Sequence, residues 1–374
     1  MRIDKMQTYA DYKKLSTEEK VLLFDEHHYG YGEVVKYFGG KAAFRPVLMR
    51  TIVNVASNAY DNTANESENA KKPIFIDAFT GGGKIALCAP KGLFSQIVMN
   101  DLDSSMYTLY RVIQSGDYKK LIGVIGDVCK VAENNLMRGL NKSIVPVYEQ
   151  AYQHKLVGQA GYISNMDILI AAVRFVTIYG SMLGTTSEDD SYTMASYSDI
   201  YRSACRVIPN IHTQIQNIII ENLDYRQLIA KYNGLPYKEH IDPETQEGGI
   251  QHEAEVEYQN VEKVYYFDPP YYVGALAKED EGYRFAFTRD QTRAMTAVLD
   301  GSDKSYGELK YWVKSDYQPL PWDEDNKMFQ SIENINGSHP EYKKFDIGPS
   351  GESAAGNKGA ARSKHEYIWV KGLA

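Results

Sequence analysis

The stretch from Val264 to Tyr272 places a carboxylate, two prolines and several aromatic rings at the end of an apolar run. Proline cannot donate a hydrogen bond to a sheet, so Pro269 and Pro270 end the strand and restrict the main chain that follows. Asp268 then lies at the strand end as an acceptor, with the Pro269 carbonyl as a second acceptor and the Tyr271 ring as a cover for a flat molecule. This pattern predicts a catalytic site for a planar substrate that carries an amino group. The alternative is a strand that runs into a turn stiffened by proline.

A glycine-rich turn follows a second apolar run and has the sequence Gly81-Gly82-Gly83-Lys84-Ile85-Ala86. It fits the G-x-G-x-x-G/A pattern, in which missing side chains let a ligand approach the backbone at the start of a helix. A phosphate-binding P-loop is excluded, because Ala78 replaces its first glycine and Ile85 follows Lys84. The turn therefore indicates a site for a dinucleotide or another adenosine ligand, with a plain turn as the alternative.

Two carboxylates flank this turn. Asp101 follows the next apolar strand, at the distance from the glycines where an acid binds ribose hydroxyls. Asp77 precedes the turn, where it would repel a pyrophosphate but accept a hydrogen bond from an ammonium group. This combination favours S-adenosylmethionine over NAD. The alternative for Asp77 is a structural role as a helix cap.

Further apolar runs predict the elements that position these residues. We expect strands at 74–79, 96–101, 217–220, 264–267, 309–313 and 366–370. We expect helices after the capping box Ser16-Thr17-Glu18-Glu19, over 44–60, after the glycine turn, over 225–232 and after Thr288, with a loop at 61–72. Alternating strands and helices predict an α/β fold with a Rossmann-like, doubly wound sheet, interrupted by a segment of different texture at 130–216.

The formal net charge of -8 comes from one segment. Residues 239–262 hold eight acidic side chains and no Lys or Arg, and the rest of the chain has 41 acidic and 41 basic side chains. We expect an inserted, solvated loop here, because this segment also contains Pro243 and the pair Gly248-Gly249. A regulatory acidic arm is the alternative. A polyanionic partner can therefore still bind elsewhere.

The three cysteines, Cys88, Cys129 and Cys205, lie far apart and lack the spacing of a metal site. They indicate a reducing interior, so we expect a cytoplasmic protein without zinc or another metal. The most apolar neighbourhood, 166–183, contains Asp167 and Arg174, so we expect no membrane span. The first residues do not lead into an apolar core, so we expect no signal peptide.

The motifs occur in a recognisable order. Tyr37-Phe38-Gly39-Gly40-Lys41 is followed by the glycine turn, Asn100-Asp101, Asn222-Leu223-Asp224-Tyr225 and Asp268-Pro269-Pro270-Tyr271. In these motifs the chain resembles the Dam-like (alpha) group of N6-adenine-specific DNA methyltransferases. It departs from that group in a long spacing between Lys41 and Asp77, in the acidic segment, and in an insertion without the recognition sequence expected for the commonest tetranucleotide target.

The resemblance implies an S-adenosylmethionine pocket and a pocket for the target base. The cofactor's methionine end would be contacted by Tyr37, Gly39, Gly40 and Lys41, and its pocket would be shaped by Asp77, Phe79, Thr80, Gly81, Gly83 and Asp268. Asp101 would hold the ribose, and Asp224 with Tyr225 would contact the cofactor adenine. Gly126 with Asp127 is a competing candidate for that last contact. The catalytic residues that receive the target base would be Asp268, Pro269, Pro270 and Tyr271.

The resemblance also implies a division of the chain. Residues 1–129 and 217–374 would form the catalytic methyltransferase domain, and 130–216 a mainly helical target-recognition domain. Contacts to double-stranded DNA would come from Tyr192, Tyr197, Arg202, Arg206, Lys358, Arg362 and Lys364. Arg202 and Arg206 are four residues apart and would share one helix face. Either can instead be solvated or contact phosphate. We expect a monomer, with a dimer on DNA as the alternative.

The implied activity is methyl transfer from S-adenosylmethionine to the N6 amine of a flipped adenine in DNA, by a solitary enzyme or by the partner of a restriction enzyme. Three other functions remain open at this point. The substrate can be RNA or a protein amide, since the Asp268 arrangement suits any planar amino group. The chain can be a DNA-binding protein without turnover, or an NAD oxidoreductase, which only the glycine turn and Asp101 favour.

Overall fold

The computed structural model describes residues 8–25, 35, 42–66, 70–134, 163–180, 196–239, 250–270, 289–317, 342–349 and 365–373. Seven strands form one sheet in the order β3-β2-β1-β6-β7-β9-β8. The parallel strands are β1 (Ile74–Asp77), β2 (Gln96–Asn100), β3 (Ile218–Glu221), β6 (Lys263–Phe267) and β7 (Trp312–Tyr317). Two antiparallel strands, β9 (His365–Lys371) and β8 (Tyr342–Pro349), complete it. The expected α/β architecture with a mostly parallel sheet is confirmed, and the sheet is compatible with a Rossmann-like fold.

The side chains of each strand alternate between two cores, because successive residues of a strand point to opposite faces of the sheet. In β6, Val264 and Tyr266 pack in one core, and Tyr265 and Phe267 pack in the other. Both faces of the sheet are therefore covered. This burial explains why the parallel strands appear in the sequence as nearly continuous apolar runs.

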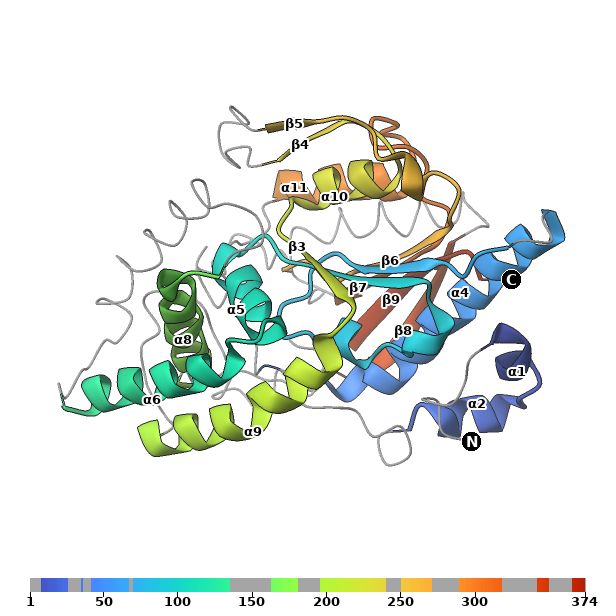
Figure 1. Ribbon diagram of the computed structural model, residues 1–374. Helices are drawn as coiled ribbons and strands as arrows, with labels where there is room; N and C mark the ends of the chain where they lie inside the picture. The colour runs from blue at the N-terminus through green and yellow to red at the C-terminus, as the bar shows by residue number, and fades with distance from the viewer. Residues whose placement is uncertain are drawn as a thin grey trace.

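Helices form a layer on each face of the sheet (Figure 1). On one face lie α4 (Arg45–Glu66), α5 (Ser104–Gln114), α6 (Tyr118–Asn134), α8 (Asn165–Gly180) and α9 (Tyr197–Ile215). The other face, at the top of Figure 1, carries α10 (Tyr225–Tyr232) and α11 (Arg289–Leu299). The predicted helix at 225–232 is confirmed, because α10 has these same bounds.

Two short helices near the N-terminus, α1 (Tyr9–Lys13) and α2 (Thr17–Leu23), precede η2 (Ala42–Phe44) and α4. α2 begins with the predicted capping box, in which Glu19 N–H donates to Ser16 Oγ at 3.1 Å and Ser16 N–H donates to Glu19 Oε2 at 2.8 Å. The expected loop at 61–72 is wrong in its first part, because α4 continues to Glu66. The polar residues of 61–66 are compatible with a helix end that extends beyond the core.

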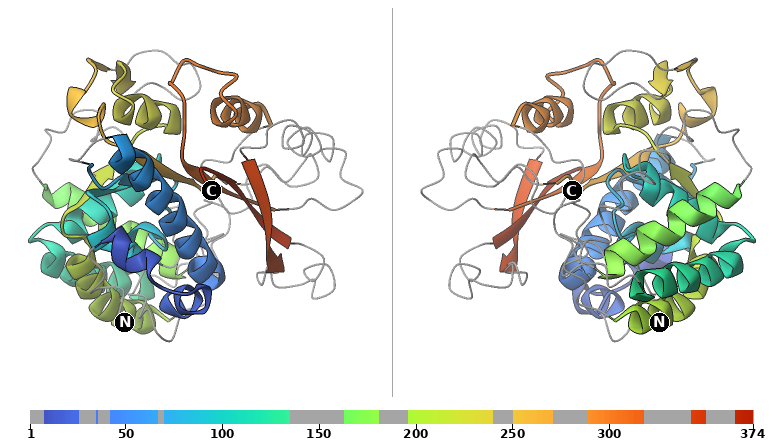
Figure 2. Two further views of the ribbon diagram at one scale, coloured as in Figure 1. Left: turned by 90° about the vertical axis from the view of Figure 1, so that its right-hand side faces the viewer. Right: turned by 90° about the vertical axis from the view of Figure 1, so that its left-hand side faces the viewer.

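The C-terminal end of the sheet departs most from our predictions. β8 was not predicted, and it forms the outer edge of the sheet beside β9 (Figure 2). β8 mixes the charged residues Lys343, Lys344 and Asp346 with an exposed Phe345, which is typical of edge strands and gives no continuous apolar run. β7 begins at Trp312, three residues later than predicted, after a turn in which Gly307 has a φ of +78°.

The acidic segment contains regular secondary structure, so the expectation of a loop over all of 239–262 is wrong. β4 (Tyr237–Glu239) pairs with β5 (Ile250–His252) in an antiparallel hairpin, and η5 (Val256–Tyr258) follows. Residues 240–249 lie outside the described residues. Glu255 anchors this hairpin to α10, because it lies 3.6 Å from Lys231 and accepts a hydrogen bond from Tyr237 Oη at 3.2 Å.

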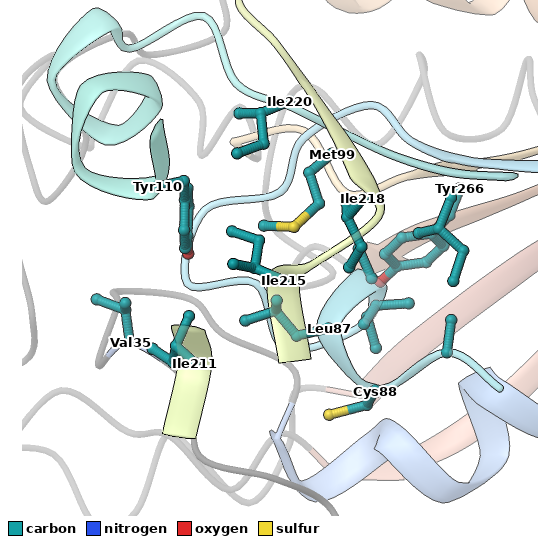
Figure 3. Close-up of a cluster of buried hydrophobic side chains, with 14 of the residues drawn as sticks. Val35, Leu87, Cys88, Met99, Tyr110, Ile211, Ile215, Ile218, Ile220 and Tyr266 are labelled. Atoms are coloured by element: carbon teal, nitrogen blue, oxygen red, sulfur yellow. The ribbon is translucent and has the colours of Figure 1, made fainter. Parts of the chain in front are cut away.

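The described helices of 130–216 share the core of the sheet. Ile211 and Ile215 of α9 belong to the same buried cluster as Leu87 and Met99 (Figure 3). In α8, Arg174 is fully buried and its Nη2 lies 2.7 Å from Asp103 Oδ2, at the start of α5. α6 also runs across the predicted boundary at residue 129. α8 and α9 are thus integral parts of the helical layer, and 135–162 and 181–195 lie outside the described residues.

Among the described helices, none combines the length and the apolar character that a membrane span requires.

Candidate functional site

The carboxyl ends of four adjacent parallel strands, β3, β2, β1 and β6, meet at one edge of the sheet. Asp77 is the last residue of β1, Asp101 follows β2, Asp224 lies shortly after β3 and Asp268 follows β6. The chain continues from β1 to β2 on one side and from β6 to β7 on the other, so the strand order reverses between β1 and β6. Ligands of open α/β sheets bind outside the carboxyl ends of the strands at such a reversal. The fold therefore brings four predicted site residues to the expected edge.

Asp77 is a buried carboxylate with an unusual environment. Its Oδ2 accepts a hydrogen bond from Ala86 N–H at 3.2 Å, whereas Oδ1 has no hydrogen-bond partner among the described residues. Burial raises the pKa of Asp77 well above its ordinary value and the charge of Asp268 raises it further, whereas the backbone N–H groups of Ala86 and Phe79 oppose this rise. Asp77 pairs in register with Tyr266, two residues before Asp268, which explains why the two carboxylates interact. A buried oxygen without a partner favours a ligand that brings a donor or a positive charge.

Hydrogen bonds to backbone groups hold the glycine turn in place. Thr80 is buried and its N–H donates to Asn100 O at 2.8 Å, and Gly83 N–H donates to Thr80 O at 2.8 Å. Tyr110 Oη donates to Gly81 O at 2.7 Å. Gly81 and Gly83 have φ angles of +47° and +74°, which only glycine adopts without strain. The turn is therefore a rigid rim of the candidate site.

The helix that we expected after this turn is not formed. Residues 81–85 form turns, and only the short 3-10 helices η3 (Ala86–Cys88) and η4 (Lys91–Leu93) precede β2. Pro90 and Gly92 leave no uninterrupted run of helix-forming residues between the turn and the strand. The start of an α-helix, where the pyrophosphate of a dinucleotide normally binds, is therefore missing at this position.

Asp101 is half-buried and bridges two turns. Its Oδ2 accepts from Gly81 N–H at 2.8 Å, and its Oδ1 accepts from Asp103 N–H at 2.9 Å. Burial raises the pKa of Asp101 to about 6, helped by the charge of Asp103 and opposed by these two hydrogen bonds and by Arg174. This carboxylate is fixed at the end of β2, where it can accept hydrogen bonds from a ribose.

Asp224 caps α10, and its position distinguishes it from Asp127, the competing candidate for the adenine contact. Asp224 is half-buried and its Oδ1 accepts from Arg226 N–H at 3.0 Å. Asp127, by contrast, is an exposed residue inside α6 that pairs with Lys130 at 3.3 Å, and Gly126 packs beneath the Tyr201 ring. Of the two candidates for the adenine contact, only Asp224 lies at the strand ends.

Aromatic rings line the strand ends beside Asp224. The ring of Phe79, which follows β1, lies 6.0 Å from the ring of Tyr225 and 6.5 Å from that of Phe267, measured between centroids. Phe79 is only half-buried, so part of its ring is open to a ligand. These rings form an apolar wall of the kind on which a nucleobase packs.

The Asp268 motif is described only in part. Asp268 and Pro270 are half-buried and Pro269 is buried directly after β6, whereas Tyr271 lies outside the described residues. Beneath the motif, Tyr266 Oη and Ser315 Oγ are 2.7 Å apart in a buried hydrogen bond. The strand before Asp268 is thereby tied to β7, which makes the support of the motif rigid.

The remaining predicted residues lie outside the described residues or on α9. Tyr37, Gly39, Gly40, Lys41, Tyr192, Lys358, Arg362 and Lys364 are outside them. Val35, two residues before Tyr37, donates its N–H to Gly82 O at 3.1 Å. On α9, Tyr197 begins the helix, Arg206 is exposed, and Arg202 is exposed and 2.9 Å from Asp199. The structure does not bring these α9 residues into the cluster at the strand ends.

Sequence reasoning missed Asn100 as a residue that organises the site. Its buried Nδ2 donates to Ala78 O at 3.0 Å and to Leu223 O at 2.9 Å, and its Oδ1 accepts from Leu223 N–H at 2.9 Å. Asn100 thus joins the ends of β1 and β3, next to Asp77 and Asp224. The available signal was an amide at the end of an apolar strand, where a polar group must find partners when buried.

Comparison with known proteins adds no identity: no protein-family model matches the chain, and no curated protein matches it. The resemblance to the Dam-like methyltransferases therefore depends on the motifs and on their positions in the fold.

Proposed function

We propose that the chain is an S-adenosylmethionine-dependent methyltransferase that modifies the N6 amine of adenine in double-stranded DNA. One observation carries this proposal. Asp77, Asp101, Asp224 and Asp268 lie at the ends of four adjacent strands around the reversal of the sheet, and Asp77 Oδ1 is buried without a hydrogen-bond partner among the described residues.

The residues present fit the cofactor. S-adenosylmethionine, when bound, supplies a methyl group activated by a sulfonium, and it also carries an ammonium group. Asp77 would accept from the ammonium, Asp101 from the ribose hydroxyls and Asp224 from the adenine amine, with Phe79 and Tyr225 packing beside the adenine. A positive ligand would also relieve the repulsion between Asp77 and Asp268 that raises the pKa of Asp77. Tyr37, Gly39, Gly40 and Lys41 complete the pocket in this proposal.

Asp268 and the Pro269 carbonyl would position the target amine. An adenine in a duplex must leave the stack before its amine can react, which costs a few kcal/mol. Stacking on Tyr271 would return about 1 to 3 kcal/mol of that. Two hydrogen bonds from the amine to Asp268 and Pro269 O would draw the nitrogen towards a tetrahedral shape and direct its lone pair along the line of attack. Asp268 acts here as a positioning acceptor and takes up the proton only as the product cation forms.

Two observations weigh against an NAD oxidoreductase. No α-helix lies between the glycine turn and β2, so a pyrophosphate would lack its usual binding place. It would also lie close to Asp77. In addition, the sixth position of the sheet is the antiparallel β9, whereas the dinucleotide fold continues there with a parallel strand. The choice between DNA, RNA and a protein amide depends on the motif resemblance, and competition among these three acceptors decides it.

The test is transfer of radiolabelled methyl groups to DNA. The wild-type protein should label adenine in duplex DNA, and Asp268→Ala should lower kcat at least a thousandfold while cofactor binding and the circular dichroism spectrum persist. Asp290→Ala, which removes an exposed carboxylate from α11, is the matched control and should keep full activity. Failure to label any DNA, RNA or peptide while the cofactor binds would refute the proposed activity. Sequencing of modified bases in DNA from cells that express the chain would report the recognition sequence.

A further inference from the structure

One side chain contacts both residues that we place beside the cofactor adenine. Arg226 donates from its backbone N–H and from Nε to the same oxygen, Asp224 Oδ1, at 3.0 and 2.8 Å. Its guanidinium also lies 5.5 Å from the centre of the Tyr225 ring. Neither of these two donors uses Asp224 Oδ2. Arg226 therefore restrains the carboxylate through one oxygen, and the Asp224 side chain also accepts a hydrogen bond from the backbone N–H of Gln227 in the capping box of α10.

The placement of Arg226 is unfavourable for the helix itself. Arg226 is in the first turn of α10, and a positive charge at the start of a helix opposes the helix dipole. Asp224 can cap α10 without any guanidinium, since capping requires only a backbone N–H of the first turn. The side-chain bond to Asp224 thus has no necessary role in forming the helix. It is also partly shielded from water, because the side chains of Arg226 and Asp224 are 29% and 25% exposed.

We infer that Arg226 is a positioning residue for recognition of the cofactor adenine, a role that rests on the proposed function. Together with the backbone donors of the capping box, Arg226 holds the Asp224 carboxylate in one rotamer, so that its remaining acceptor site would stay available to the 6-amino group of the adenine. Removing the Arg226 side chain leaves the acceptor and its backbone donors in place but removes the charged donor that fixes its orientation most tightly, so recognition of the amino group weakens.

The experiment measures the binding of two ligands by calorimetry. One is S-adenosylhomocysteine, and the other is its analogue in which oxygen replaces the 6-amino group. Arg226→Ala should weaken the first by about tenfold, equivalent to about 1.4 kcal/mol, and leave the second unchanged within twofold. Asp224→Ala should show the same selectivity, and the double variant should bind like Asp224→Ala alone, because Arg226 acts through Asp224. In the transfer assay, Arg226→Ala should raise KM for the cofactor and leave kcat unchanged.

Controls separate this inference from a general loss of stability. Arg293→Ala removes an exposed arginine that lies 3.5 Å from Asp290 in α11, and it should bind both ligands like the wild type. An equal penalty for both ligands in Arg226→Ala, or penalties that add in the double variant, would overturn the positioning role and leave the proposed function intact. If the wild-type protein binds neither S-adenosylhomocysteine nor S-adenosylmethionine, both proposals are wrong.

Discussion

Asp77 ends β1 and pairs in register with the strand that leads to Asp268, and the charge of Asp268 adds to burial in raising the pKa of Asp77. The free protein therefore keeps two neighbouring carboxylates at its candidate site, one of them with a buried oxygen that lacks a partner among the described residues. Such an arrangement lowers the stability of the free protein and favours binding of a positive ligand.

Asp77→Asn should make the free protein more stable at pH 9, by about 1 to 3 kcal/mol, because it removes a buried charge. The folded protein holds the Asp77 proton to a higher pH than the unfolded chain, in which the ordinary pKa is about 4. Stability is therefore greatest below that value and falls as the pH rises through the raised pKa, so the advantage of the variant should shrink at pH 5. Urea denaturation at both pH values measures the difference.

Asp127→Asn is the control for this measurement. Asp127 is an exposed carboxylate on α6, so its replacement should change stability by less than about 0.5 kcal/mol at either pH. If the wild-type protein is as stable as Asp77→Asn at pH 9, Asp77 does not carry a destabilising buried charge at that pH.

Binding of S-adenosylmethionine should release protons and strengthen as the pH rises. A cation beside Asp77 stabilises the ionised carboxylate, and the raised pKa of Asp101, about 6, adds a second group that can release a proton. Each proton released steepens the dependence towards tenfold in affinity per pH unit. Calorimetry in buffers of different ionisation enthalpy counts the protons. The pH dependence should be smaller in Asp77→Asn, and equal wild-type affinities at pH 6 and pH 8 would argue against the arrangement.

Two glycines should respond to alanine in opposite directions. A Cβ at Gly83 would lie 2.7 Å from Leu87 Cδ1 and 3.1 Å from Tyr110 Oη, and the φ of Gly83 is +74°. Gly83→Ala should therefore destabilise the protein by about 2 kcal/mol or more and disturb the turn beside Asp77. Gly123 lies in α6 with no atom within 4 Å of its virtual Cβ, so Gly123→Ala should stabilise by about 0.5 to 1 kcal/mol. Urea denaturation of both variants tests the pair.

The buried pair Arg174 and Asp103 predicts that α8 unfolds together with the sheet. Arg174→Met should cost about 3 to 5 kcal/mol, because it leaves the Asp103 charge buried opposite an apolar side chain. Adding Asp103→Asn should recover part of this loss, since asparagine can still accept from Ser105 N–H at the start of α5. Tryptophan fluorescence, to which Trp312 and Trp369 of the sheet contribute, should follow the change. An unaltered fluorescence transition would indicate that α8 is an independent unit.

Local patterns predicted much of the fold. The capping box at Ser16 and the helix at 225–232 depend on neighbouring residues and were correct. The edge strand β8 was not predicted, and the helix predicted after the glycine turn is absent. β8 is stabilised by hydrogen bonds to β9, and a strand of charged and exposed residues has no apolar period of its own. The expected helix failed because Pro90 and Gly92 divide a short crossover that the fold completes with turns.

The positions of Asp77, Asp101, Asp224 and Asp268 follow from the sequence, because each stands at or just after the end of an apolar run. That these ends meet at one edge depends on the order in which the strands pair, which only the tertiary structure decides. The fold also decides the burial of Asp77, the hydrogen bonds by which Asn100 joins two strand ends, and the hydrogen bond from Arg226 to Asp224. The physical reason is range: strand periodicity and capping act over a few residues, whereas burial and electrostatic interactions depend on partners that are far apart in the chain.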